Sequence, residues 1–211
     1  MFLTSLWSLY FNDNDFYAFI ESGFITTLTA VILILLAKKG KDSKAINLRD
    51  GFYLVTITWI LMGLFCSLPY YQSIYFNSFI DAFFESMSGI TTTGATIVGS
   101  NLGYSIEELP HGILFWRSFT QFIGGMGIIL FTIAILPILG MGGVQLFRAE
   151  VPGPTTDKLT PRIKETAKYL WGIYLGLILL ETIVLYIEGI LFNIDKMTFF
   201  NAICHSMTTI S

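Results

Sequence analysis

The stretch "DAFFESMSGITTTGAT", residues 81–96, decides how the rest of the chain is interpreted. It joins a short apolar segment to three consecutive threonines and a glycine. As a helix, the apolar residues 79–89 would reach about 16 Å, which is half the thickness of a bilayer core. This segment is too short to cross a membrane, so the polar loop that follows it requires a physical explanation.

The composition of the whole chain indicates a membrane protein. Of its 211 residues, 54% are hydrophobic and only 13% are charged, whereas a soluble domain carries about 25% charged residues. Crossing a hydrocarbon core takes roughly 17 to 25 apolar residues. Runs of that length are Phe16–Ala37, Gly51–Leu68, Ile113–Leu136 and Tyr169–Ile187. The predicted class is therefore an all-α integral membrane protein, and the net charge of −3 disfavours nucleic acid as a partner.

The basic residues predict which loops face the cytoplasm. Of the 12 lysines and arginines, five lie in 38–50 and five in 141–168, so the positive-inside rule places both segments in the cytoplasm. The external segments are then 1–15, 69–112 and 188–211. Four crossings satisfy this arrangement only if the short apolar pieces 79–89 and 198–207 enter and leave the membrane on its outer side, or lie on its surface.

An internal repeat favours re-entry. At a displacement of 120 residues, "DAFFESMSGIT" (81–91) aligns with "NAICHSMTTIS" (201–211). The identical pairs are Ala82/Ala202, Ser86/Ser206, Met87/Met207 and Ile90/Ile210. Both copies follow a predicted span at the same face, so the repeating unit is a span, a half-helix, a polar loop and a second span.

This unit divides the chain into four predicted segments. An extra transmembrane helix and a cytoplasmic loop occupy 1–50, and the first repeat occupies 51–140. A cytoplasmic connector occupies 141–168, and 169–211 forms the first half of a second repeat.

The polar loop has the chemistry of a cation path. Irregular backbone at membrane depth must be buried in protein or line water, and backbone carbonyls that face a path can replace the hydration shell of a cation. Gly94 permits backbone torsions that a Cβ would forbid. The loop carries no charge, which favours a monovalent cation, while Asp81 and Glu85, with Glu107 and Glu108 beyond them, make the outer mouth negative. The alternative is an ordinary turn that caps a surface helix.

Several ordered motifs also resemble a known family. They are the opening stretch, "FWRSFTQFIGGMGIIL" (115–130), "AILPILGMGGVQLFRAEVPGP" (134–154) and "KLTPRIKETAKYLWGIYL" (158–175). From about Arg49 onward the chain resembles the Trk/Ktr family of potassium transporters, in particular its TrkH-type membrane subunit. The resemblance implies a pore of four span–half-helix–span repeats in one chain, each of which supplies one filter strand.

The resemblance also implies which residues form the filter. The first strand would be Thr91, Thr92, Thr93 and Gly94. Potassium would be coordinated by the backbone oxygens of Thr92 and Thr93, and the second strand would start at Ser211. Because this chain holds about one and a half of the four repeats, it is interpreted as an N-terminal fragment with an incomplete pore.

The implied function is potassium uptake across the cytoplasmic membrane of a bacterium or archaeon. Potassium is then the transported ion, no cofactor is expected, and the chain is not an enzyme. The implied partners are the lipid bilayer, a second copy in a homodimer, and a cytoplasmic nucleotide-binding regulatory subunit of the TrkA type. The alternative is a non-transporting scaffold or assembly subunit that keeps a relic pore repeat.

Three features inside the spans carry their own predictions. Arg117 lies in the third span, where a charge is costly and usually paired. We expect it to pair with Glu85 and support the half-helix; the alternative is that it reaches the outer interface.

The "GGMG" motif at 124–127 predicts close helix packing, with a flexible hinge as the alternative. Glu181 is either a buried partner or lies outside the true fourth span.

Overall fold

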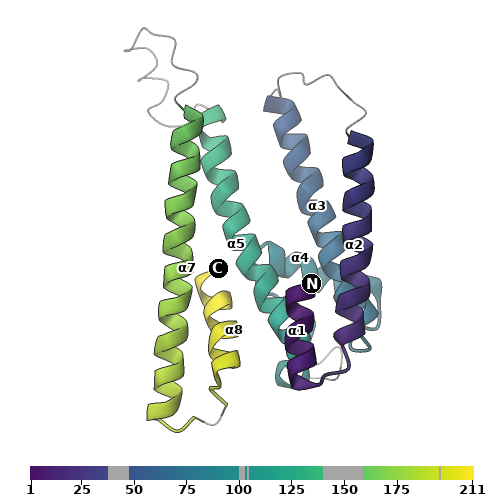
Figure 1. Cartoon of the computed structure of the whole chain (residues 1–211), viewed down its shortest axis with the longest axis vertical. Helices are drawn as coiled ribbons and strands as arrows, with labels where there is room; N and C mark the ends of the chain where they lie inside the picture. The colour runs from purple at the N-terminus through teal and green to yellow at the C-terminus, as the bar shows by residue number, and fades with distance from the viewer. Residues whose placement is uncertain (38–47, 100–102, 104, 140–158, 195) are drawn as a thin grey trace. The chain divides into compact units, whose positions relative to one another are not determined.

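The computed structural model describes residues 1–37, 48–99, 103, 105–139, 159–194 and 196–211. Its helices are α1 (Phe2–Phe11), α2 (Phe16–Ala37), α3 (Leu48–Gln72), α4 (Phe79–Ile90), the short 3-10 helix η1 (Ile106–Glu108), α5 (His111–Leu139), α7 (Leu159–Leu191) and α8 (Phe199–Ile210), as Figure 1 shows. Most of the basic residues of 38–50, and residues 141–158 of the predicted connector, lie outside the described part of the chain.

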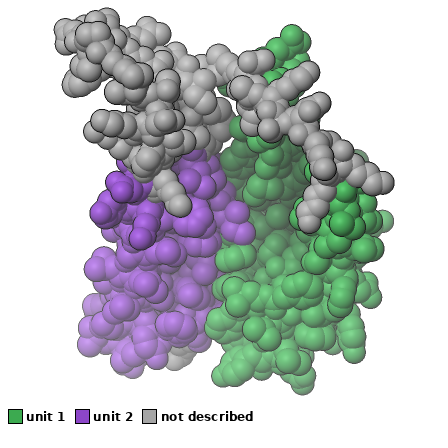
Figure 2. Space-filling model, turned by 45° about the horizontal axis from the view of Figure 1, so that its top comes forward, with its two compact units in different colours: residues 1–121 green, residues 122–211 purple. Residues whose placement is uncertain are grey.

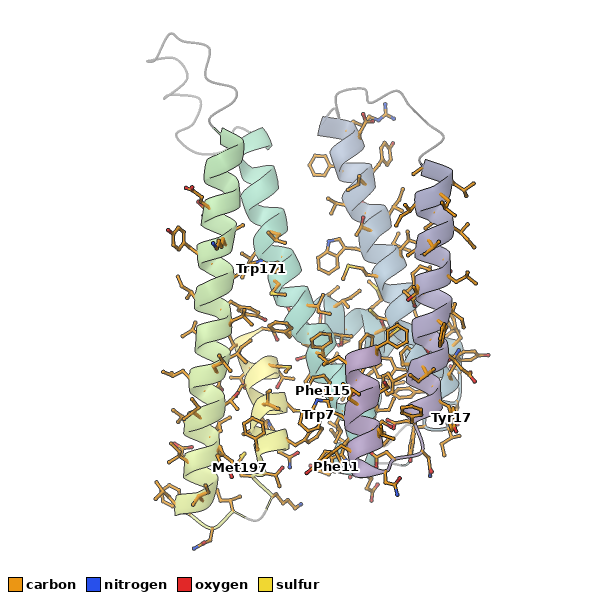
Figure 3. All side chains as sticks on the ribbon, in the orientation of Figure 1. Trp7, Phe11, Tyr17, Phe115, Trp171 and Met197 are labelled. Atoms are coloured by element: carbon orange, nitrogen blue, oxygen red, sulfur yellow. The ribbon has the colours of Figure 1, made fainter. Side chains whose placement is uncertain are left out.

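Four of these helices are long and apolar enough to cross a membrane. The spans are Phe16–Ala37, Arg49–Gln72, His111–Leu130 and Glu165–Leu191. The first is identical to its predicted span and the other three overlap theirs, and the chain is an all-helical, multi-pass membrane protein. Large apolar side chains cover their outer surfaces; Tyr17, for example, is 73% exposed and points away from its neighbours (Figure 3).

Two helices extend beyond the predicted spans, and each extension contains a proline. The second span was expected to end before Pro69, yet α3 continues through this residue to Gln72. Pro69 is fully buried, and this packing offsets the backbone hydrogen bond that a proline in a helix removes. Helix α7, which contains the fourth span, begins at Leu159, so the end of the predicted connector 141–168 is helical. Pro161 lies in its first turn, where the missing N–H has no intrahelical partner to lose.

Helix α1 lies within 1–15, the segment predicted to be external, and no helix was predicted there from the sequence. Its buried residues are Thr4, Ser5 and Ser8, whereas its leucines are exposed. This pattern is the reverse of a soluble amphipathic helix, which is why hydrophobic periodicity does not reveal it. In Figure 3, Trp7 lies beside Phe115, and their ring centroids are 5.7 Å apart.

The described chain divides into two compact units, Met1–Gln121 and Phe122–Ser211, coloured separately in Figure 2. The division falls within α5 and reflects which residues pack together. It does not test the predicted boundaries of the repeats, which remain predictions. In the first unit, a core joins α2, α3, α4, the following loop and the start of α5. It consists of Phe19, Tyr70, Phe76, Ala82, Val98, Leu109, Ile113 and Trp116. In the second unit, α8 packs along α7.

The internal repeat is present in the local structure. Helices α4 and α8 begin and end 120 residues apart and have 12 residues each. The caps follow the same displacement: the hydroxyl of Ser78 accepts a hydrogen bond from the amide of Asp81 at 3.1 Å, and that of Thr198 accepts one from Asn201 at 3.3 Å. A hydroxyl at this position satisfies one of the free amides of a helix start.

Candidate functional site

Residues 91–94, which we call the threonine loop, fold back onto the end of α4. The amide of Thr91 donates to the carbonyl of Met87 at 2.9 Å, and that of Thr93 donates to Ser88 at 3.0 Å. The amide of Thr92 donates to Gly89 at 3.0 Å. The amides of the loop are therefore used by the last turn of the helix.

The carbonyls of the threonine loop are left available. Among the described residues, no hydrogen bond reaches the carbonyl oxygens of 91–94, whereas the next carbonyl, that of Ala95, accepts the hydroxyl of Ser88 at 2.5 Å. The hydroxyls of Thr91 and Thr93 lie 2.8 Å apart, and the former donates to Met87. Four consecutive carbonyls are thus free, while two of the three threonine hydroxyls are engaged.

Two residues of the threonine loop have left-handed backbone conformations. Gly94 has φ of 72°, and a Cβ built on it would meet no atom within 4 Å, so its backbone torsion rather than space favours glycine. Thr92 has φ of 55°. This conformation is rare for a β-branched residue and costs on the order of 1–3 kcal/mol, so it persists only where surrounding contacts enforce it.

Behind the threonine loop, Glu85 and Arg117 form the expected ion pair. The Nε of Arg117 lies 2.6 Å from Oε1 of Glu85, and the two side chains are 15% and 1% exposed. The arginine therefore does not simply extend to the outer interface. An ion pair withdrawn this far from water needs every remaining hydrogen-bonding position satisfied.

The remaining acceptor positions of Glu85 bind the segment that follows the threonine loop. The hydroxyl of Thr96 contacts both carboxylate oxygens, at 2.9 and 3.0 Å, and the amide of Ile97 donates to Oε2 at 3.2 Å. Glu85 therefore ties α4 both to α5 and to the returning chain. Sequence reasoning missed Thr96 and Ile97, because neither residue type marks a carboxylate partner.

Close helix contacts fix the position of α4. The hydroxyl of Ser86 donates to the carbonyl of Gly63 in α3 at 2.9 Å. On another side, a Cβ at Gly89 would collide with the hydroxyl of Thr120 in α5. Both glycines thus allow the short helix to approach its neighbours at backbone distance.

Ser211 repeats the local geometry of Thr91. It follows α8 directly, and its hydroxyl donates to the carbonyl of Met207 at 2.6 Å, as Thr91 does to Met87 at 2.7 Å. The equivalent of Glu85 differs, because the exposed His205 occupies that position. The second copy therefore has an exposed histidine at the position where the first copy has its buried carboxylate.

Two aspartates outside the spans cap the start of α5. Oδ2 of Asp13 accepts the amide of His111 at 2.7 Å, and Oδ2 of Asp15 accepts that of Ile113 at 3.0 Å. The other oxygen of Asp15 accepts the hydroxyl of Ser8. Carboxylates satisfy the free amides of a helix start and its positive dipole end. Burial nevertheless raises the pKa of Asp15. Sequence reasoning also missed these caps, since they join residues that lie 98 positions apart.

The other carboxylates considered in the sequence analysis are Asp81, Glu107, Glu108 and Glu181, and they differ in burial. Asp81 is half-buried in the first turn of α4, and Glu107 and Glu108 are exposed in η1. Glu181 lies well inside the fourth span, so the alternative that it falls outside this span is wrong. Its Oε2 is buried, with no hydrogen-bond partner among the described residues.

The family model for TrkH, described as a cation transport protein, matches residues 18–211. The chain belongs to the TrkH family. This is a family of transport proteins and not of enzymes.

Several potassium-uptake proteins are similar to this TrkH-family chain. The Trk system protein TrkH of Vibrio parahaemolyticus is 42% identical over 213 residues, which cover all of this chain and 41% of the relative. TrkH of Escherichia coli is 43% identical with the same coverage. TrkG of Escherichia coli is 40% identical over 81% of this chain and 33% of its own length.

A solved structure supports the same fold. The crystal structure of the potassium transporter TrkH from Vibrio parahaemolyticus aligns with a TM-score of 0.75 and 35% identity, covering 98% of this chain and 38% of that one. The chain therefore spans about two fifths of the length of the TrkH relatives it matches.

Proposed function

We propose that this chain forms the first pore repeat, and the start of the second, of a transporter that takes up potassium across the cytoplasmic membrane. One observation carries this proposal: after a helix of half-membrane length come four consecutive carbonyls that accept no hydrogen bond from the described residues. Carbonyl oxygens replace the water around a dehydrated cation without adding charge. In this proposal α4 and α8 are re-entrant, and Thr92 and Thr93 coordinate potassium through their backbone oxygens.

The pattern of hydrogen bonds favours coordination by carbonyls over hydroxyls. The hydroxyls of Thr91 and Thr93 contact each other, so they are already engaged, while the carbonyls of the threonine loop accept nothing from the described chain. Glu85 and Arg117 then support this filter strand from behind, through Thr96 and Ile97. The names of the similar proteins, which are Trk system potassium uptake proteins, agree with potassium as the ion.

A complete path needs oxygens from all sides of the ion, so we propose that four repeats surround it. This chain supplies one complete threonine loop and Ser211, the first residue of the next. In the full-length transporter we further propose a homodimer and a cytoplasmic nucleotide-binding regulatory subunit of the TrkA type.

The test is Gly94→Ser in the full-length transporter, expressed in a host that lacks other potassium uptake. Serine disfavours φ of 72°, so the carbonyls should leave their positions and discrimination of potassium over sodium should fall. A loss of about 1.4 kcal/mol in relative affinity corresponds to a tenfold change in competition by sodium.

Gly103→Ser is the matched control, because Gly103 is also exposed with φ of 76° and open space around it. It should leave selectivity unchanged at equal protein level in the membrane. If Gly94→Ser altered neither uptake nor selectivity, the threonine loop would be only a turn, and the role of a non-transporting scaffold would be favoured.

A further inference from the structure

The "GGMG" motif of α5 lies against one side chain of α7. Tyr174 is only 6% exposed, and its hydroxyl donates to the carbonyl of Phe122 at 3.3 Å. The rings of these two residues stack with centroids 5.5 Å apart and an interplanar angle of 14°. The phenol is thus held by both its ring and its hydroxyl.

Gly125 makes this contact possible. A Cβ at this position would lie 2.6 Å from the hydroxyl oxygen of Tyr174 and 3.2 Å from the Cβ of Ser211. The first distance is shorter than non-bonded carbon and oxygen atoms allow. Tyr174 of α7 and Ser211, which follows α8, therefore both pack against the backbone of α5 at Gly125, where even one added methyl group would contact both of them. This geometry favours the packing role of the motif over a hinge.

Ser211 completes the junction. Its side chain is a neighbour of the Tyr174 hydroxyl, since a Cβ on Gly125 would contact both of them, and its own hydroxyl donates to the carbonyl of Met207. The hydroxyl of Tyr174 therefore lies between a backbone carbonyl of α5 and the first residue after α8.

We infer that Tyr174 is a positioning residue for the second filter strand, which it holds against α5 at Ser211; this inference rests on the proposed function. The first repeat uses a different anchor. Displacement by 120 residues places Leu54, an exposed apolar residue, where Tyr174 stands. Conversely, the carboxylate position of Glu85 corresponds to His205. The first strand is therefore anchored behind its loop by a carboxylate, and the second is anchored where it begins by a phenol.

The experiment is Tyr174→Phe in the full-length transporter. Phenylalanine keeps the ring stack on Phe122 and removes only the hydroxyl. A neutral hydrogen bond contributes about 0.5–1.5 kcal/mol, so the discrimination of potassium over sodium should fall by roughly twofold to tenfold, with the membrane level of the protein unchanged. The control is Tyr169→Phe on the same helix, because Tyr169 is 72% exposed and should leave selectivity intact.

A second pair of variants separates positioning from general packing. Gly125→Ala should displace the hydroxyl of Tyr174 and reduce selectivity further. Combining it with Tyr174→Phe removes the closest contact of the new methyl group, so the double variant should discriminate better than Gly125→Ala alone. Unchanged selectivity in Tyr174→Phe, or a double variant no better than Gly125→Ala, would overturn the inference.

The outcome is distinguishable from failure of the proposed function. If Gly94→Ser reduces selectivity and Tyr174→Phe does not, the filter assignment stands and the role of Tyr174 is wrong. If Gly94→Ser has no effect, the filter assignment itself is wrong, whatever the tyrosine variant does.

Discussion

Replacing Glu85 with glutamine tests whether the ion pair behind the threonine loop stabilises it. Glutamine keeps the size of the side chain but replaces one carboxylate oxygen with an NH₂ group. The carboxylate contacts Arg117, Thr96 and Ile97. The single oxygen of glutamine cannot accept from all three donors. Its NH₂ group would face one of these donors and could not accept from it.

The expected loss follows from the burial of the pair. Removing one partner of a buried ion pair costs about 3–5 kcal/mol, since the other charge is left without compensation. Glu85 is 1% exposed, which places it among buried groups, but Arg117 keeps 15% exposure and some solvation. We therefore expect the lower end, about 3 kcal/mol, or a factor of more than 100 in the folding equilibrium.

The assay is a double-mutant cycle on the full-length protein. The unfolding free energy of each variant is measured in mixed micelles titrated with a denaturing detergent, alongside potassium uptake at matched protein level. Because Glu85→Gln combined with Arg117→Gln removes both charges, the double variant should recover about 1–2 kcal/mol relative to the sum of the single losses. Glu188→Gln, at an exposed carboxylate of α7, should change neither quantity.

Additive losses in this cycle would refute the reasoning, because additivity means that the two side chains do not interact. A loss in Glu85→Gln below about 0.5 kcal/mol would also refute it. Such a value is typical of a surface substitution and is incompatible with a buried carboxylate that contacts three residues.

Three further predictions concern other parts of the chain. Thr92→Val keeps the β-branched shape and removes only a hydroxyl, so it should reduce selectivity less than Gly94→Ser in the same sodium-competition assay. In Asp15→Asn the single oxygen can still accept the amide of Ile113, and the NH₂ group can donate to the hydroxyl of Ser8. Because burial raises the pKa of Asp15, the wild-type unfolding free energy should rise relative to this variant as pH falls through that raised pKa; a constant difference between pH 4 and 8 would contradict this. Cysteines at Lys41 and Lys158, which lie outside the described residues, should be labelled only from the cytoplasm, and one at Glu107 only from outside.

The spans and the short helices were predictable because their causes are local. A run of apolar residues of sufficient length forms a helix in a membrane, whatever its neighbours are, since lipid cannot satisfy free backbone groups. The repeat fixed both half-helices to within a few residues for a similar reason: cap, apolar stretch and following hydroxyl recur at the same displacement. The Glu85–Arg117 pair was also predictable, because an intramembrane arginine requires a partner and few carboxylates were available.

Helix α1 and the path of α3 through Pro69 depended on tertiary structure. In α1 the buried residues are small and polar, while its leucines face outward, so its sequence lacks the periodicity that marks a soluble helix. For Pro69, local propensity predicts an end to the helix, and burial of the residue overrides that propensity.

The detailed contacts of the candidate site were also decided only by the fold. The sequence alone determined that a threonine-glycine loop follows a half-length helix, and that a carboxylate and an arginine lie near it. Only the structure showed that the carbonyls of the loop accept no hydrogen bond from the described residues, that Thr96 and Ile97 contact Glu85, and that Tyr174 lies beside Gly125 and Ser211. The contact of Tyr174 with Gly125 joins helices distant in the chain, while those of Glu85 join α4 to the loop that follows it. In both cases, hydroxyls and backbone amides carry no partner preference that a sequence pattern could reveal.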